Sequence, residues 1–283
     1  MRLRPALWLL ICALILGNGA LWYVAVARET GKLHVSVLDV GQGDAILIEG
    51  PTGTQVLIDG GRDRSVLRRL GTLMPLFDRS IDLVIATHPD ADHIGGLPGV
   101  FSRYRVSYYM DGAAAGDTAQ AAALDKTVED EDGMEVIETE RGTRIDLGGG
   151  AYLDVLYPDR EAPSIENNTG SVVARLVYGE TSFMFTGDAP SAVEDWLVRL
   201  DGEALKSDML KAGHHGSKTS TGEAWLTAVA PDYVAISAGK DNSYGHPSPE
   251  VVARAVATGA RIVSTMEEGT LTFLSDGAAV TYK

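Results

Sequence analysis

The sequence predicts an α/β protein in which two β-sheets pack against each other and helices cover their outer faces, an αββα sandwich. Short apolar segments of strand length alternate with amphipathic segments of helix length along almost the whole chain. Clusters of strands flanked by helices are typical of packed sheets with helices outside. No internal repeat, low-complexity stretch or long linker interrupts the pattern, so one domain is expected over residues 28–283.

The first segment predicts export. Arg2 and Arg4 precede an apolar run over residues 5–27, which is long enough for a membrane-spanning helix of roughly 20 residues. The basic flank should stay inside, which places the rest of the chain across the membrane. Ala25-Val26-Ala27 also has the small-x-small pattern of a signal-peptidase site. A cleaved signal peptide and a retained transmembrane anchor both fit residues 1–27, and both predict an exported, extracytoplasmic protein.

The first half of the domain opens with three strands joined by tight glycine-containing turns, as in a β-meander. A helix, a buried strand and a helix–strand–helix unit follow, and the acidic run 129–132 is expected in a surface loop. The expected strands are 34–38, 45–49, 55–58, 81–86, 106–109, 135–138, 143–146 and 151–157, and the expected helices are 63–73, 96–104 and 118–126.

The second half begins with a polar, proline-containing loop and then repeats strands and helices. The expected strands are 171–178, 182–186, 207–211, 233–237, 262–264, 270–274 and 279–282, and the expected helices are 189–200, 222–228 and 249–258. Helices in this half follow strands directly, which favours a sheet with helices on its outer face.

Charge and cysteine content exclude some classes of protein. A formal net charge of −15 argues against a protein that binds nucleic acid through an extended basic surface. A nuclease stays open, because bound divalent cations change the local charge of a site. Cys12 is the only cysteine, so a disulfide framework and a cysteine-rich zinc module are excluded.

The histidines gather in a few places. Five of the six lie in three loops, and each loop follows an expected apolar strand; they are His88, His93, His214, His215 and His246. Strand ends are where sheets present catalytic groups. Carboxylates share these loops, so the distribution indicates a metal site.

The densest of these loops is Thr87-His88-Pro89-Asp90-Ala91-Asp92-His93-Ile94-Gly95-Gly96. Four potential ligands lie within six residues, and unpaired buried carboxylates are too unfavourable to be packed there without cations or water. His88 and Asp90 occupy alternate positions of an extended loop, so their side chains can point to the same side and bind one metal. Asp92 and His93 lie at the following turn, where their side chains can reach a second metal.

These residues carry a resemblance. His-x-Asp-x-Asp-His followed by Gly-Gly resembles the metal signature of the metallo-β-lactamase superfamily. Five further segments resemble, in order, the hydrolase domain of ComEC-like competence proteins: Asp39-Val40-Gly41-Gln42-Gly43-Asp44-Ala45, Ile58-Asp59-Gly60-Gly61, Phe185-Thr186-Gly187-Asp188, Lys211-Ala212-Gly213-His214-His215-Gly216-Ser217-Lys218 and Tyr244-Gly245-His246-Pro247. The resemblance covers almost all of residues 33–273 and implies the metallo-β-lactamase fold with two divalent metal ions.

The resemblance implies two ligand sets and also shows a departure. The third histidine that the superfamily usually supplies to the first metal falls near Asn167-Asn168, and asparagine is a poorer ligand. The first site is then expected to use His88, Asp90 and Asp188, and the second Asp92, His93, Asp188 and His215. Adjacent side chains point in different directions, so His214 is expected to support the site or face substrate.

Asp188 is expected to bridge the two metals. It closes an apolar strand, and Gly187 permits the sharp turn there. A carboxylate has two oxygens and can bridge cations about 3.5–4 Å apart. The alternative, an N-cap for the following helix, is weaker because the neighbouring motifs carry the other ligands. The mixed oxygen–nitrogen donors suit Zn²⁺ or Mn²⁺, with Mn²⁺ slightly favoured.

Other groups are expected to handle catalysis and substrate. Asp92, His214 and His246 are the expected catalytic groups, and His246 precedes a helix whose N-terminus favours an anion. Ser217, Lys218 and Thr219 offer donors for phosphate oxygens, although Lys218 fits a surface charge equally well. The remaining expected substrate-binding residues are Gln42 and Asp44 in a glycine-rich turn, and Asn168.

The sequence therefore predicts a metal-dependent hydrolase of phosphodiesters that acts outside the cytoplasmic membrane, with two metals supplying the attacking water. Single-stranded DNA is the first candidate substrate, and a phosphocholine or teichoic-acid ester of the envelope is the second. A lactonase or thioesterase on the same fold and a non-catalytic metal-binding module are the alternatives. No second long apolar run occurs, so DNA uptake as such is not implied. No obligate protein partner is indicated, and contact with a membrane is expected through the N-terminal helix if it is retained.

Overall fold

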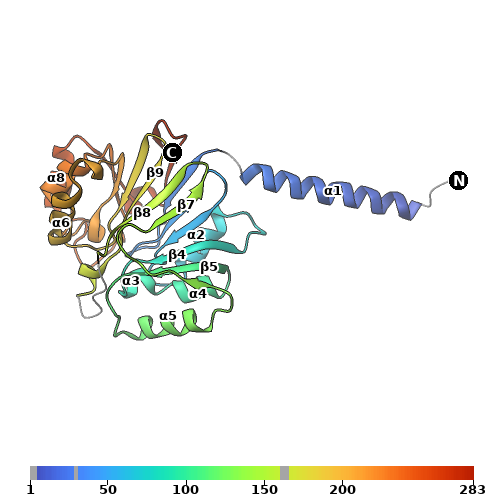
Figure 1. Cartoon of the computed structure of the whole chain (residues 1–283), viewed down its shortest axis with the longest axis horizontal. Helices are drawn as coiled ribbons and strands as arrows, with labels where there is room; N and C mark the ends of the chain where they lie inside the picture. The colour runs from blue at the N-terminus through green and yellow to red at the C-terminus, as the bar shows by residue number, and fades with distance from the viewer. Residues whose placement is uncertain (1–4, 29–30, 160–165) are drawn as a thin grey trace.

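The computed structural model describes residues 5–28, 31–159 and 166–283, and it confirms the expected αββα sandwich. Within those ranges, one sheet of eight strands has the order β15-β14-β1-β2-β3-β4-β5-β6, and one of seven has the order β13-β12-β11-β10-β9-β8-β7. Figure 1 shows α2, α3, α4 and α5 on the outer side of the first sheet, with α6 and α8 outside the second.

The first sheet begins as the predicted meander. Strands β1 (Leu33–Val37), β2 (Ile46–Glu49) and β3 (Gln55–Ile58) pair antiparallel in chain order. Strands β4 (Ser80–Ala86), β5 (Arg105–Asp111) and β6 (Glu135–Val136) then add in parallel. The last strands, β14 (Leu271–Ser275) and β15 (Val280–Tyr282), return to pair on the other side of β1.

The second sheet changes direction at its centre. Strands β7 (Arg144–Gly148), β8 (Ala151–Tyr157), β9 (Val173–Tyr178) and β10 (Thr181–Phe185) are antiparallel. Strands β11 (Met209–Lys211), β12 (Tyr233–Ile236) and β13 (Arg261–Ser264) are parallel to β10. The carboxyl ends of β10, β11 and β12 therefore lie at one edge, which is the usual place for a site in such sheets.

Strand periodicity explains the layers. Val35, Ile48, Leu153 and Phe183 face the core between the sheets, whereas Leu47 and its neighbours face the helices outside the first sheet. Because successive strand residues point to opposite faces, each sheet contributes to two apolar layers. A third cluster lies between the second sheet and its helices.

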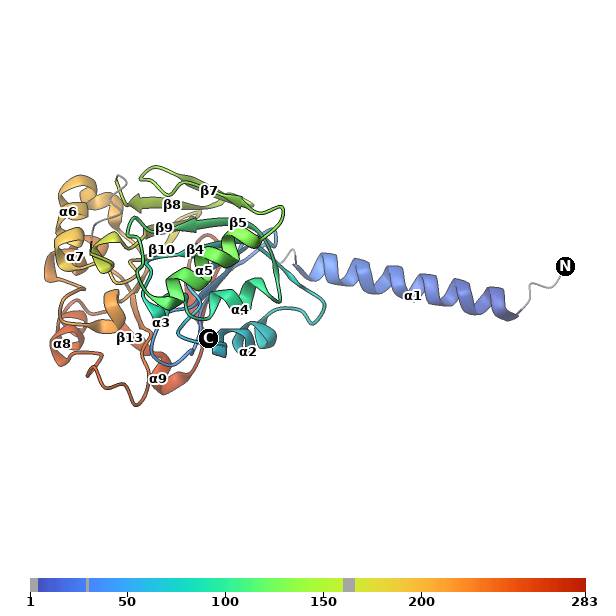
Figure 2. The ribbon, with the colours of Figure 1, turned by 90° about the horizontal axis from the view of Figure 1, so that it is seen from below.

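Helices cover both outer faces. On the first sheet they are α2 (Ser65–Leu73), α3 (Ala91–Ile94), α4 (Leu97–Phe101) and α5 (Ala119–Asp130), and on the second α6 (Ser191–Asp201), α7 (Glu223–Val229) and α8 (Pro249–Ala257). The short α9 (Thr265–Glu268) follows β13. Figure 2 shows α5 lying across β5 beside α4, with α3 at its end.

Two features of the helices differ from the sequence prediction. Residues 129–130 end α5 and are not in a loop, because the helix continues beyond the predicted residue 126. Helices α3 and α9 were not predicted, since four residues are too few to show a helical period. The predicted proline-containing loop falls partly on residues 160–165, which lie outside the described residues.

The N-terminal segment forms the predicted helix, α1 (Pro5–Arg28). It extends away from the sandwich in Figure 1, and Leu9, Ile15 and Leu16 on it are exposed. In the part of the chain with described side chains, no helix is both long and apolar enough to cross a membrane. Arg2 and Arg4 lie outside the described residues, and the signal peptide or anchor stays a prediction.

Candidate metal centre

Loops that follow three strands meet at one edge of the sandwich, two of them bearing histidines and one bearing Asp188. His88 follows β4, Asp188 follows β10, and His215 follows β11. The rings of His88 and His93 have centroids 4.1 Å apart, and those of His93 and His215 are 5.1 Å apart. Residues that are more than 120 positions apart in the sequence therefore form one buried cluster.

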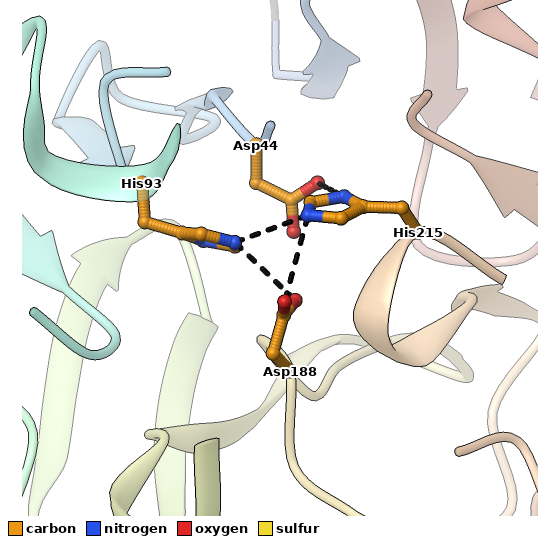
Figure 3. A group of neighbouring side chains, drawn as sticks. All are labelled: Asp44, His93, Asp188 and His215. Carbon is orange, nitrogen blue, oxygen red and sulfur yellow. Dashed lines mark hydrogen bonds and ion pairs between the residues drawn. The ribbon is translucent and has the colours of Figure 1, made fainter. Parts of the chain in front are cut away.

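Asp188 is the centre of this cluster. Its Oδ1 lies 3.3 Å from Nε2 of His93, and its Oδ2 lies 3.5 Å from Nε2 of His215 and 4.0 Å from Nε2 of His88. Figure 3 shows the carboxylate directed at the two imidazoles of His93 and His215. The alternative of an N-cap is wrong, because α6 begins at Ser191 with Pro190 at its N-cap position.

The predicted second set converges. His93 Nε2 lies 3.3 Å from His215 Nε2, and His215 Nε2 lies 3.6 Å from Asp92 Oδ2. Asp92 lies in the first turn of α3 and His93 in its last, so one short helix presents both side chains. The structure thus brings Asp92, His93, Asp188 and His215 together as predicted.

The predicted first set is looser than the second. His88 Nε2 lies 3.7 Å from Asp90 Oδ2, and it makes no hydrogen bond although it is buried. Asn167 donates from Nδ2 to Asp90 Oδ1 at 2.7 Å. Asn167 therefore orients an acidic ligand at the position where the resemblance implied a histidine.

Asp59 holds two of the histidines. Its Oδ2 lies 2.7 Å from Nδ1 of His93 and accepts a hydrogen bond from the Thr87 hydroxyl at 2.8 Å. Because that hydroxyl donates to Asp59, its oxygen is left to accept from Nδ1 of His88, 3.0 Å away. Both rings are thereby fixed with Nε2 toward Asp188, the arrangement in which histidines bind metals.

The sequence reasoning assigned no role to Asp59 or Thr87. A signal was present in Ile58-Asp59-Gly60-Gly61, where the carboxylate follows a buried strand. Asp59 has φ of 60°, a left-handed conformation that is uncommon outside glycine and clusters at functional sites.

His215 is fixed by different partners. Its Nδ1 lies 3.0 Å from the carbonyl oxygen of Ser237 and 3.3 Å from Asp44 Oδ1. Asp44 also forms an ion pair with Lys211, and both side chains are buried. The carboxylate of Asp44, which the sequence predicts to bind substrate, faces the outer nitrogen of His215. Asp44 lies close enough to join a metal-binding group with His93, Asp188 and His215, but its pairing with Lys211 favours an orienting role.

Two adjacent histidines face the same carboxylate. His214 and His215 have φ of 49° and 54°, so both are in the left-handed region. His214 Nε2 also lies 3.5 Å from Asp188 Oδ2. The expectation that adjacent side chains point apart fails here, because two successive left-handed residues turn both rings inward. His215 is buried and His214 is partly exposed, which agrees with ligand and substrate-facing roles, respectively.

His246 lies beside His214 at the mouth of the site. Their ring centroids are 5.5 Å apart, and Thr219 Oγ1 lies 3.2 Å from Nδ1 of His214. Asn242 holds the backbone of His246 by two hydrogen bonds, and Nδ1 of His246 is buried without a partner. His214 thus lies next to both Asp188 and His246.

The remaining predicted substrate-binding residues differ in their exposure and in their hydrogen-bond partners. Gln42 accepts a hydrogen bond from Gly239 N at 3.2 Å, which supports a loop-positioning role. Asn168 Oδ1 is buried and has no hydrogen-bond partner among the residues that the structure describes. Ser217 is buried and bonds the side chain of Thr219, whereas Lys218 is exposed.

The donor set fits divalent metals. Within the described part of the chain, His88 Nε2 and Asp188 Oδ1 are buried and make no hydrogen bond, which is costly unless a cation or water satisfies them. Imidazole and carboxylate donors suit Zn²⁺ and Mn²⁺. Asp188 Oδ1 faces His93 and Oδ2 faces both His88 and His215, so the carboxylate contacts histidines of both predicted sets.

Burial and charge set the protonation of the cluster. Burial, and then the charge of His93, lowers the pKa of His88 to about 4. Burial opposes ionisation of Asp188, but the positive charges of His215 and His93 hold its pKa well below its usual value. Neutral His88 and ionised Asp188 are the forms that bind metal.

Comparison with known proteins agrees with this geometry. Residues 38–240 match the sequence model of the metallo-beta-lactamase superfamily. The chain is 30% identical over 263 residues to ComE operon protein 3 of Bacillus subtilis (strain 168), covering 85% of this chain and 33% of that protein. It is 29% identical over 265 residues to competence protein ComA of Neisseria gonorrhoeae, covering 92% of this chain and 35% of that protein. The chain thus spans about a third of the length of these relatives.

Solved structures share the fold. The metallo-beta-lactamase fold protein YhfI from Bacillus subtilis aligns with a TM-score of 0.56 and 11% identity, covering 84% of this chain and 98% of that one. The diiron beta-hydroxylase CmlA from Streptomyces venezuelae also aligns with a TM-score of 0.56, at 16% identity, covering 85% of this chain and 53% of that one.

Proposed function

Because the chain belongs to the metallo-beta-lactamase superfamily of metal-dependent hydrolases, we propose that it hydrolyses phosphodiesters at the site around Asp188. The observation that carries the proposal is the central position of Asp188, whose carboxylate lies within 4.0 Å of the Nε2 atoms of His88, His93 and His215. Two-metal sites of this kind suit in-line displacement at phosphorus.

The residues that would hold two divalent cations, Zn²⁺ or Mn²⁺, are those of the two converging sets. Asp188 would bridge, with His88 and Asp90 on one side and Asp92, His93 and His215 on the other. Bound there, the cations lower the pKa of water toward neutrality and stabilise negative charge on a phosphoryl oxygen.

The chain's own residues then position substrate and move a proton. A water oxygen forms a bond to phosphorus, the bond from phosphorus to the leaving oxygen breaks, and that oxygen takes up a proton. His214 and His246 lie at the open side of the cluster and are placed to donate it. Asn168, with a buried oxygen lacking a hydrogen-bond partner, carries an amide that can donate to a phosphoryl oxygen.

Nucleic acid is the first substrate class we propose. Two relatives are named as a competence protein and a recombination protein, and the strand would be single, since the net charge of −15 disfavours a long duplex. We also propose that the activity lies outside the cytoplasmic membrane, as the apolar N-terminal segment implies.

A second substrate class is a small amine-bearing phosphodiester, such as an envelope phosphocholine or teichoic-acid ester. A specific feature favours it, namely an acidic cavity directly beside His88. The same two-metal chemistry serves both substrates.

The test uses the full chain, stripped of metal and then supplied with Mn²⁺ or Zn²⁺. We expect cleavage of bis(4-nitrophenyl) phosphate that depends on added metal and is abolished in Asp188→Ala. Asp195→Asn, an exposed carboxylate on α6, is the matched control and should retain activity. Cleavage of single-stranded DNA under the same conditions selects the nuclease.

Absence of diester cleavage despite bound metal would contradict the proposal and favour a lactonase or thioesterase. Absence of bound metal would indicate a non-catalytic module.

A further inference from the structure

A cavity of about 210 Å³ adjoins the metal centre and takes no part in metal binding. It lies between the end of β5, residues 112–116 and α5, and shares His88 and Pro89 with the metal-binding loop. Asp111 pairs in register with Ala86, two residues before His88, so the cavity begins next to the first ligand. Its volume is below the roughly 300 Å³ typical of sites for drug-sized ligands, so it suits a small head group.

The walls of the cavity are mostly small and apolar. They are formed by Ala86, Ile94, Ala114, Ala115, Ala121 and Leu124. Gly112 fixes the floor, because an added Cβ there would lie 2.2 Å from the carbonyl oxygen of Thr87. The cavity is therefore shaped by backbone contacts and is not a gap between mobile side chains.

Its polar groups carry negative charge or accept hydrogen bonds. Asp111 and Asp125 both line it, and none of the lining residues that the structure describes is lysine or arginine. Both aspartates are exposed, so their carboxylates lie at the open rim of the cavity. Desolvation, and then the charge of Asp125, raises the pKa of Asp111. Two neighbouring carboxylates without a basic partner are stabilised by a bound cation.

Tyr109 gives an independent indication of a ligand. Its side chain is only 4% exposed and lines the same cavity. Within the described residues its ring packs against Phe101, but its hydroxyl makes no hydrogen bond. The hydroxyl is not fully enclosed by protein, and because Tyr109 lines the cavity, it is placed to meet a polar group of a bound molecule there.

We infer that this cavity binds an organic ammonium group carried by the phosphodiester, with Asp111, Asp125 and Tyr109 around the cation while the phosphate lies at the metal centre. The inference rests on the proposed phosphodiesterase activity. In this cavity a nucleobase would be disfavoured because it is neutral and would not offset the charge of the two carboxylates, so the inference selects the second of the two proposed substrate classes. An ammonium ester neutralises both ends of the site, since its phosphate meets the metals and its cation meets the carboxylates.

The experiment compares two chromogenic diesters that release the same nitrophenolate. We would measure kcat/KM of the full chain for 4-nitrophenyl phosphorylcholine and for bis(4-nitrophenyl) phosphate. Both substrates release the same leaving group, so a change in this ratio between variants reports on the site that receives the choline group. Asp111→Asn and Asp125→Asn should each lower this ratio about tenfold, as expected for loss of a charge-assisted contact.

Two further variants separate binding from folding. Tyr109→Phe removes only the hydroxyl and should lower the ratio by a smaller factor. Asp130→Asn, five residues beyond Asp125 on α5 and outside the cavity, should leave it unchanged. A ratio that Asp111→Asn and Asp130→Asn leave equal would overturn the inference.

Other outcomes are equally decisive. If thymidine 5′-(4-nitrophenyl phosphate) is hydrolysed in preference to the choline ester and Asp111→Asn abolishes that preference, the cavity binds a nucleobase and the inference is overturned. If no diester is hydrolysed, the proposed function fails, and choline and ethanolamine are titrated calorimetrically into the same protein. Saturable binding that Asp111→Asn weakens then supports ammonium binding in the cavity, and lack of binding refutes it.

Discussion

Asp59 Oδ2 lies 2.7 Å from Nδ1 of His93, and the same oxygen accepts the hydroxyl hydrogen of Thr87. One buried carboxylate thus orients His93 directly and His88 through one hydroxyl. Its other oxygen accepts the backbone N–H of Thr87 at 2.8 Å, so Asp59 also fixes the start of the metal-binding loop. The site depends on a residue that touches none of the expected metal positions.

Asp59→Ala should therefore lower metal affinity without removing a ligand. Loss of such an orienting partner typically lowers metal affinity about 10–100-fold. The measurement is a competition titration of Zn²⁺ or Mn²⁺ against a chromogenic chelator. Asp195→Asn is the control of unchanged affinity. Equal affinity of Asp59→Ala and the unmodified chain would show that the two histidines are held by packing alone.

Much of the fold and of the metal centre was predictable because the signals are local. The strand β3 coincides with the predicted 55–58, and the ligands lie in motifs adjacent to strand ends. The orientation of His214 was not predictable, because two left-handed residues in succession have no sequence signature outside glycine. The pairing of Lys211 with Asp44 joins positions that are distant in the sequence, and the cavity at Tyr109 depends on the register of β4 and β5.

Gly43→Ala should disturb the site through the backbone. Gly43 has φ of 124°, and an added Cβ would lie 2.0 Å from the carbonyl oxygen of Asp92. We expect a loss of several kcal/mol in the free energy of unfolding, together with weaker metal binding, since α3 presents Asp92 and His93. Gly71→Ala in α2 is the matched control, because nothing lies within 4 Å of its Cβ position. It should stabilise the chain by about 1 kcal/mol, and denaturation in urea measures both variants.

Lys211→Met should leave the buried carboxylate of Asp44 without its cationic partner and so lower the free energy of unfolding. Lys211 is 0% and Asp44 1% exposed. Burial alone opposes ionisation of Asp44, and the positive charges of Lys211 and His215 hold its pKa below the usual value. Breaking a buried pair on one side typically destabilises by about 3–5 kcal/mol. The double variant Lys211→Met with Asp44→Asn should recover part of this loss. Additive effects in chemical denaturation would contradict the coupling.

Glu194 should make the stability depend on pH. This buried side chain of α6 accepts hydrogen bonds from the backbone of Thr221 and Gly222, just after the His214–His215 turn. Burial raises its pKa from 4.5 to about 7. Its folded pKa lies above its unfolded value, so its contribution is fully present below pH 4.5 and is lost as the pH rises through 7. A shift of this size corresponds to about 3 kcal/mol.

The unfolding free energy of the unmodified chain, measured in urea from pH 4 to 8, should therefore fall with rising pH relative to that of Glu194→Gln. Parallel pH profiles of the two proteins would show that Glu194 has an ordinary pKa in the folded chain.

His214 and His215 should separate into two roles although both face Asp188 Oδ2 at 3.5 Å. His215 is buried against Asp92 and His93 and is fixed through Nδ1 by Ser237, so His215→Ala should reduce the bound metal from two ions to one. His214 is partly exposed beside His246, so His214→Ala should retain both ions and lower kcat by about 10²–10⁴-fold, as for a lost general acid. Metal content by mass spectrometry and the absorption spectrum of the Co²⁺-loaded protein distinguish them. Loss of an ion in His214→Ala would instead make His214 a ligand of the first site, in place of the histidine that Asn167-Asn168 replaces.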